Sequence, residues 1–232
     1  REMDKFLLKR YKVDINELKP WHYQNLYFQE EPKIFSLNLD KFYSEDILPI
    51  AINFYRGIGF DVKDILDRSD LYEKPGKYPH ACCIDIDRGN DVRTIQNLKN
   101  NEKWMDTLLH ELGHAIYGKT YGEKNYKELP FMLRNSAHTF TTEGIALFFG
   151  RLSKNKYFIK KYCKISEERA EEIGKELAKV LKFRELVFCR WSQVMFNFER
   201  KLYKNPDQDL NKLWWDLVKE YQLIDFYRDK PD

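Results

Sequence analysis

The sequence has few cysteines, no long apolar run and little excess of either charge. It contains 4 Cys in 232 residues. Neither their spacing nor the adjacent pair Cys82-Cys83 fits a disulfide framework or a zinc knuckle. No apolar run approaches the roughly 20 residues needed to cross a bilayer, so no membrane segment is predicted. We therefore expect free thiols in a reducing compartment, which favours a cytoplasmic location.

The charge balance argues against a nucleic-acid partner. The 40 basic and 37 acidic residues leave a formal net charge of +3, and no long basic stripe runs along the chain. Hydrophobic residues make up 43% and charged residues 33%, which is typical of a globular protein. The chain is long enough to bury a substantial core. It shows no signal peptide, internal repeat or low-complexity tract.

The stretch His110-Glu111-Leu112-Gly113-His114 carries the clearest chemical signal. It lies within residues 101–117, where apolar residues recur mostly at spacings of three or four and predict a half-buried helix. In a helix, residues four apart share one face, so His110 and His114 can bind one metal ion. Glu111 lies one position further round, where it can accept a proton from a water molecule at the metal.

A third ligand is available downstream. Thr141 to Ala146 open a second apolar helix, with Glu143 near its start. Two imidazoles and one carboxylate leave a fourth position open, as a catalytic zinc site requires. We therefore predict one Zn²⁺ per chain, held by His110, His114 and Glu143. The alternative is a helical scaffold with a chance motif, which would bind no stoichiometric zinc.

The rest of the pattern predicts a mainly α-helical protein. Residues 80–85 and 91–98, separated by the turn Arg88-Gly89-Asn90, predict a small antiparallel β-sheet directly before the motif helix. The edge of such a sheet, next to the metal site, can hold an extended peptide by main-chain hydrogen bonds. Further helical patterns cover residues 1–13, 44–58, 166–203 and 209–223. We expect Ser44 to cap the second of these helices, Asn100 or Asn101 to cap the motif helix, and Thr139 or Thr141 to cap the helix that carries Glu143.

These residues resemble the gluzincin zinc peptidases, and within them the oligopeptidase and angiotensin-converting-enzyme group. Leu133-Arg134-Asn135-Ser136-Ala137 through Glu143-Gly144-Ile145 is similar to the segment that delivers the third zinc ligand in those peptidases. His80-Ala81 resembles their substrate-binding edge strand, and Asp106-Thr107 is also oligopeptidase-like. The resemblance covers residues 78–152 well and the remainder only by its general helical character.

The resemblance implies a role for each matched residue. His110, His114 and Glu143 would bind zinc, while Glu111 would act as general base and then carry the proton to the leaving amine. His80 would hold the substrate by its ring and Ala81 by its main chain, although an ordinary histidine at a strand end is as good a reading of His80. We assign His138 to the start of the helix or the lining of the cleft.

Two departures from the family pattern affect this expectation. Many gluzincins have a carboxylate four residues after the ligand Glu, where this chain has Leu147. Asp106 is our candidate to orient a zinc histidine in its place; a solvated helix charge is the alternative. The downstream Tyr and His that stabilise the oxyanion in relatives have no counterpart here.

We therefore expect residues 1–232 to form a single catalytic-type domain, a fragment of a longer peptidase. The predicted function is zinc-dependent hydrolysis of peptide bonds in short peptides, with the missing flanking parts of the same peptidase as possible partners. Two alternatives stay open. One is a zinc hydrolase acting on a non-peptide amide or ester, and the other is an inactive zinc- and peptide-binding pseudo-peptidase.

Overall fold

The computed structural model describes residues 2–23, 28, 37–125, 128–136 and 138–224. Its contacts divide the chain into two compact units, which are described separately below. One unit is Leu37–Leu177, and the other combines Arg1–Ser36 with Ala178–Asp232. The expectation of one catalytic-type domain stays a prediction.

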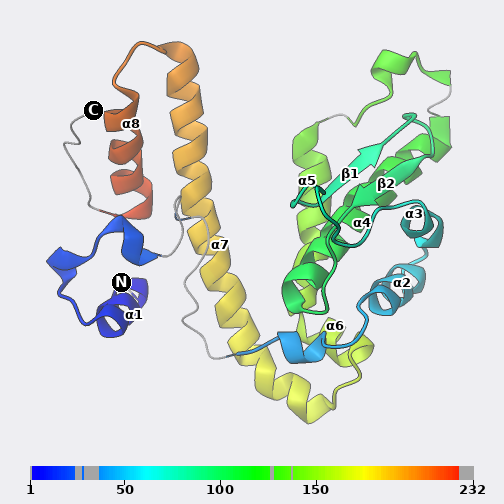
Figure 1. Ribbon diagram of the computed structural model, residues 1–232, viewed down its shortest axis with the longest axis horizontal. Helices are drawn as coiled ribbons and strands as arrows, with labels where there is room; N and C mark the ends of the chain where they lie inside the picture. Colours follow the sequence, from blue (N-terminus) through cyan, green and yellow to red (C-terminus); the bar gives the residue numbers. More distant parts are fainter. Residues whose placement is uncertain (1, 24–27, 29–36, 126–127, 137, 225–232) are drawn as a thin grey trace. The chain divides into compact units, whose positions relative to one another are not determined.

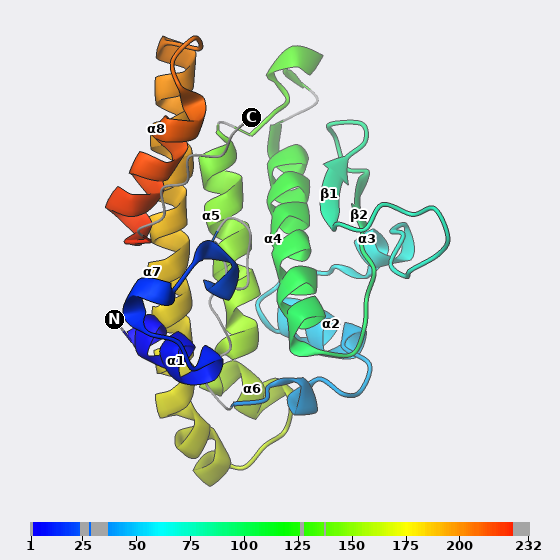
Figure 2. The same ribbon diagram turned by 60° about the vertical axis from the view of Figure 1, so that its left-hand side comes forward.

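The unit Leu37–Leu177 contains every residue of the predicted metal site. Figure 2 shows helix α4 between helix α5 and a two-stranded hairpin, which overlaps α4 in the view of Figure 1. The strands are antiparallel, with Cys82 opposite Ile95 and Asp85 opposite Val92. The elements in order are η3 (Asp40–Phe42), α2 (Leu48–Gly57), α3 (Lys63–Asp67), β1 (Cys82–Asp85), β2 (Val92–Ile95), α4 (Glu102–Asn125), η5 (Phe131–Leu133), α5 (Thr139–Gly150), η6 (Arg151–Lys154), α6 (Lys156–Tyr162) and the start of α7 (Glu167–Lys204). The prediction of a mainly α-helical protein with a small antiparallel sheet is confirmed.

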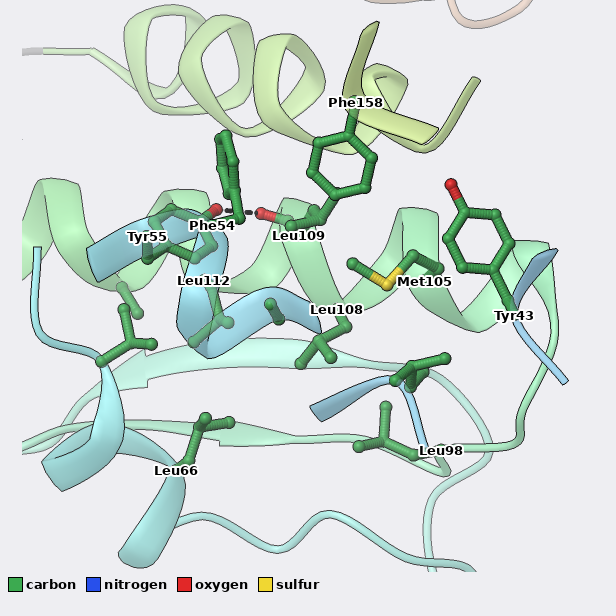
Figure 3. Close-up of a cluster of buried hydrophobic side chains, with 14 of the residues drawn as sticks. Tyr43, Phe54, Tyr55, Leu66, Leu98, Met105, Leu108, Leu109, Leu112 and Phe158 are labelled. Carbon is green, nitrogen blue, oxygen red and sulfur yellow. Dashed lines mark hydrogen bonds between the residues drawn. The ribbon is translucent and has the colours of Figure 1, made fainter. Parts of the chain in front are cut away.

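One face of α4 is fixed by the hydrophobic core of this unit. Leu108, Leu109 and Leu112 are fully buried there, among side chains from α2, α6 and the loops (Figure 3). The hydroxyl of Tyr55 on α2 donates to the carbonyl oxygen of Leu109 at 2.6 Å. This apolar stripe fixes the rotation of α4 about its axis. It therefore also fixes the direction in which His110 and His114, on another side of the helix, point.

Side chains also fix where the two site-bearing helices begin. The Asn101 carboxamide oxygen accepts the N–H of Trp104 at 2.9 Å, so the predicted N-cap of the motif helix is confirmed. Helix α5 is capped by His138, whose Nδ1 accepts the N–H of Phe140 at 2.9 Å. The prediction of a cap at Thr139 or Thr141 was wrong, whereas the assignment of His138 to the start of the helix is confirmed.

The other unit contains α1 (Glu2–Tyr11), η1 (Ile15–Glu17), η2 (Pro20–Tyr23), the later turns of α7, α8 (Leu210–Leu217) and the π-helical continuation η7 (Val218–Gln222). Its core includes Leu7, Val194 and Leu217. In the part of the chain that the structure describes, no helix combines the length and the apolar character needed to cross a membrane.

Candidate metal centre and substrate cleft

Three side chains from α4 and α5 converge on one point. The Nε2 atoms of His110 and His114 lie 3.2 Å apart. Glu143 Oε1 lies 3.4 Å from His114 Nε2, and Glu143 Oε2 lies 3.7 Å from His110 Nε2. One ligand atom from each residue therefore lies within 4.8 Å of the others.

These separations and donor types fit zinc. Ligand atoms about 2.1 Å from a tetrahedral ion stand about 3.4 Å from one another, close to the distances found here. Imidazole nitrogen and carboxylate oxygen are both ordinary zinc ligands. Burial lowers the pKa of both histidines, more than the neighbouring Glu143 carboxylate raises it. The neutral imidazoles that a metal requires are therefore favoured.

Glu111 lies beside this cluster on α4 without being part of it. Its side chain is only 7% exposed, and burial, then the Glu143 carboxylate, raise its pKa to about 7. Burial and the Glu111 carboxylate in turn raise the pKa of the Cys82 and Cys83 thiols. Glu111 is therefore close both to Glu143 and to the start of β1, and it lines the same cleft.

A buried lysine supports the first turns of α4. Lys154, at the end of η6, has a side chain that is 7% exposed. Its Nζ contacts Asp106 Oδ2 at 2.7 Å and also pairs with Glu102 Oε1. The Glu102 carboxylate accepts the Ser153 hydroxyl at 2.7 Å. This network connects the segment after α5 to the helix that carries the histidines.

Asp106 also lies close to His110, the first of the two histidines. Its carboxylate raises the pKa of His110, opposing the lowering by burial. A Cβ atom on Gly150 would lie 2.6 Å from Asp106 Oδ1 and 3.2 Å from His110 Cβ. A side chain at position 150 would therefore press on the Asp106 carboxylate, and the last residue of α5 packs close to His110. Leu147, at the position of the expected carboxylate, is 48% exposed.

A cleft of about 670 Å³ runs from the three converging side chains along β1. Its floor and walls include the consecutive residues 81–85, together with His110, Glu111, His114 and Glu143. Ile86 N–H donates to Asp91 O, so these two residues form a hydrogen-bonded pair of the hairpin. The main-chain N–H and C=O groups of Thr94 instead bond to Ser69 and Asp70, on the side away from β1. In this register the N–H and C=O groups of Cys83 and Asp85 point away from β2. Among the described residues, no strand pairs with that edge of β1.

The two expected substrate-binding residues differ in their position relative to the cleft. Ala81 lines the cleft. His80 is not part of the lining; it is exposed on the surface and its ring lies 5.3 Å from that of Tyr78. Both residues precede β1 rather than lying in it. Ala137, within the family-like segment, lies outside the described residues.

Several lining residues had no predicted role. Arg88 was recognised only as part of a turn, Arg134 only as part of a family-like segment, and Tyr117 only as the end of a helix.

Lys154, which lies outside the cleft lining, had no signal in the sequence, because its partners Glu102 and Asp106 lie about fifty positions earlier. The cysteines are free thiols, as expected, and Cys82 and Cys83 line the cleft.

Comparison with known proteins places the chain in a family. A family model described as angiotensin-converting enzyme, a peptidase family, matches residues 34–227. The chain belongs to the angiotensin-converting enzyme family of peptidases. The resemblance to the gluzincin group is therefore confirmed. No curated protein matches the chain in a sequence search.

A solved structure shares the fold. A protein from Bacillus anthracis str. Ames, assigned as an oligoendopeptidase F, superposes with a TM-score of 0.52 and 17% sequence identity. The match covers 95% of this chain and 38% of that one. At this identity the likeness concerns the fold, and the chain spans well under half of the length of that relative.

Proposed function

We propose that this chain provides the zinc site and part of the substrate cleft of a metallopeptidase that hydrolyses peptide bonds in short peptides. The observation that carries the proposal is the convergence of His110, His114 and Glu143 at zinc-like separations in a cleft bounded by an unpaired strand edge. Family membership and the shared oligoendopeptidase fold support it.

His110, His114 and Glu143 would hold the metal. A bound zinc ion would supply Lewis-acid polarisation of the scissile carbonyl and a lowered pKa for water. Glu111 would take the proton of the attacking water and deliver it to the leaving amine. Its burial beside the ligands, without sharing their common point, supports a proton-transfer role over ligation.

The substrate backbone would lie along β1. Cys83 and Asp85 direct their free main-chain groups away from β2, and Ala81 continues the cleft lining before the strand. An extended peptide can pair with such an edge through backbone hydrogen bonds, which recognise any sequence. His80 would contribute at the rim. Asp106 would act as a positioning residue for His110.

The first experiment is metal analysis of the purified chain, with His114→Ala as the control. We expect about one zinc per wild-type chain, lost on chelation with EDTA and absent from His114→Ala. Activity on a panel of short internally quenched peptides is measured in parallel. Absence of zinc after metal is offered at neutral pH would overturn the proposal.

The comparisons favour one alternative over the others. The chain covers 38% of its structural relative, so a site that binds zinc and peptide without turnover is the specific competitor. Stoichiometric zinc with peptide binding, but no cleavage of any peptide, would establish that alternative. Cleavage of non-peptide amides or esters, without cleavage of any peptide, would instead establish a different zinc hydrolase.

A further inference from the structure

The outward face of β1 carries a column of apolar side chains beside the free edge of the strand. Successive side chains of a strand point to opposite faces. Cys83 packs against the core, so Cys82, Ile84 and Ile86 point to the other face. Ile84 is 42% exposed and Ile86 is 54% exposed. Cys82 and Ile84 also line the cleft, so this column borders the place where a substrate would lie.

The neighbouring strand does not cover Ile84. Arg93 lies directly opposite it on β2, but the Arg93 guanidinium is held by Asp91. Its Nε donates to Asp91 Oδ1 at 2.8 Å and its Nη2 to Asp91 Oδ2 at 2.6 Å. This ion pair joins two residues of the same segment, two positions apart. Ile84 therefore remains exposed although it has a cross-strand neighbour.

The free edge of β1 lacks the usual protection against pairing. Exposed edge strands are commonly protected by outward-pointing charged side chains, by proline or by a bulge. The outward positions 82, 84 and 86 hold Cys, Ile and Ile, and residues 82–85 pair with β2 in a regular register. Among the described residues no other strand pairs with β1. Because this edge borders the metal cleft, its natural occupant is the substrate peptide.

Strand pairing brings one peptide side chain against Ile84. The free N–H and C=O groups belong to Cys83 and Asp85, so a peptide on this edge would form its hydrogen bonds at those two residues. Ile84 then stands in a non-hydrogen-bonded pair of the new ladder. In such pairs the Cα atoms of antiparallel strands approach to about 4.5 Å and the side chains touch. The peptide residue opposite Ile84 would therefore pack on its exposed side chain.

The direction of β1 decides which side of the scissile bond this residue lies on. The strand begins close to Glu111 and ends at Asp85, opposite Val92. Val92 Cγ2 lies 3.6 Å from the position that a Cβ atom on Gly118 would occupy. Thus β1 and α4 run the same way, and the metal end of the cleft is at the start of β1. An antiparallel peptide would place residues that precede the scissile bond along β1.

Strand geometry gives the approximate position in the peptide. Each residue of an extended chain advances about 3.3 Å, so Ile84 lies about 7 Å beyond the start of β1. The residue opposite Ile84 would then be about two or three residues before the scissile bond. Its immediate neighbours in the peptide point to the other face and do not meet the apolar column.

We propose that the cleft selects peptides with an aliphatic side chain two or three residues before the scissile bond, which packs on Ile84 at the free edge of β1. This inference rests on the proposed peptidase function and names the substrate class of that site. Main-chain pairing accepts any sequence, whereas contact with an exposed isoleucine rewards an apolar side chain at one position and not at the next.

Quenched peptides that differ by one valine-for-threonine exchange test the preference. The two side chains have the same shape and both favour strands, so the exchange changes little besides polarity. It is moved from four residues before to three residues after the scissile bond, and kcat/KM is measured with the zinc-loaded chain. We expect about a fivefold higher kcat/KM for valine at the position opposite Ile84, mainly through a lower KM, and no advantage at the adjacent positions.

Two variants and a matched control attribute the preference to Ile84. Ile84→Thr should bring the valine-to-threonine ratio near one. Ile84→Lys should replace the aliphatic preference by a preference for glutamate over glutamine at the same peptide position, because opposite charges attract across a strand pair. Ile58→Thr is the control, because Ile58 is 45% exposed in the same unit but lies outside the cleft lining. It should leave the ratio unchanged.

Peptide binding to Glu111→Gln, followed by fluorescence anisotropy, separates recognition from turnover. Tighter binding of the valine peptide that is lost in Glu111→Gln/Ile84→Thr supports the inference even if the wild type cleaves nothing, in which case the peptidase function alone fails. Cleavage without a valine preference, or with one that Ile84→Thr leaves intact, overturns the inference and leaves the function standing. A preference confined to positions after the bond also overturns it. Neither binding nor cleavage of any peptide overturns both.

Discussion

The Cα atom of Ala146 on α5 lies 3.0 Å from the position that a Cβ atom on Gly113 would occupy. The ring of Phe149 lies almost as close, with its Cδ2 atom 3.1 Å from that position. Gly113 is therefore the contact point at which α5 packs directly onto the backbone of α4. Because His110 and His114 flank Gly113 and Glu143 lies one turn before Ala146, this contact sets the separation of the three metal-binding candidates.

Gly113→Ala should weaken zinc binding and destabilise the unit Leu37–Leu177. The new methyl group would meet backbone on one side and an aromatic ring on the other, and such overpacking costs about 1–3 kcal/mol. Zinc titration and urea unfolding measure the two effects. The matched control is Gly118→Ala on the same helix, whose nearest contact is an ordinary 3.6 Å. Full zinc affinity in Gly113→Ala would show that the close helix contact does not set the site geometry.

Lys154→Met should destabilise the protein more than removal of any exposed lysine. The substitution leaves the carboxylates of Glu102 and Asp106 without their shared cation, and both are largely buried. Breaking a buried ion pair on one side costs about 3 kcal/mol or more. Lys63→Met is the control, because the Lys63–Asp67 pair is 63% and 60% exposed and should contribute less than about 1 kcal/mol. Equal free energies of unfolding for the two variants would contradict a structural role for this network.

The local patterns of the sequence predicted most of the secondary structure. The apolar stripe of α4, its Asn101 cap and the hairpin before it are short-range features, and they were predicted correctly. The end of α4 was not, because Gly118 suggested a loop although the helix continues to Asn125. Ser44 was expected to cap the next helix upstream, which instead begins at Leu48, where Asp46 Oδ1 accepts the Leu48 N–H.

Sequence patterns could not predict contacts between residues that lie far apart along the chain. The i to i+4 spacing placed His110 and His114 on one face, but only the packing of α5 brings Glu143 to them. The Lys154 network and the approach of Arg88 to Phe131 join segments more than forty positions apart. His80 matched a family motif, yet its ring lies outside the cleft lining, since the chain before β1 turns it toward Tyr78.

Asp106→Asn should weaken zinc binding and destabilise the protein less than Lys154→Met, because Glu102 still pairs with Lys154. Asp106 lies near His110 and raises the pKa of that histidine, so its negative charge favours a metal cation at the same ring. Removing partners that orient metal ligands typically costs about 10–100-fold in affinity. Competition with a chromogenic chelator measures the dissociation constant, and Asp67→Asn serves as the control, because the Asp67 side chain on α3 is exposed. An unchanged zinc affinity would indicate that Asp106 acts only through Lys154.

Glu111→Gln should retain zinc and lose most of the hydrolytic activity. The substitution preserves the size of the side chain and leaves His110, His114 and Glu143 intact, but an amide cannot accept the proton of the attacking water. Loss of a positioned general base costs about 10²–10⁴-fold in kcat. Zinc content and kcat are measured on the same preparation, with Glu73→Gln as a control, because Glu73 is exposed and pairs with Lys99 away from the cleft. Loss of zinc in Glu111→Gln would place Glu111 among the ligands, whereas full activity with zinc retained would remove it from the mechanism.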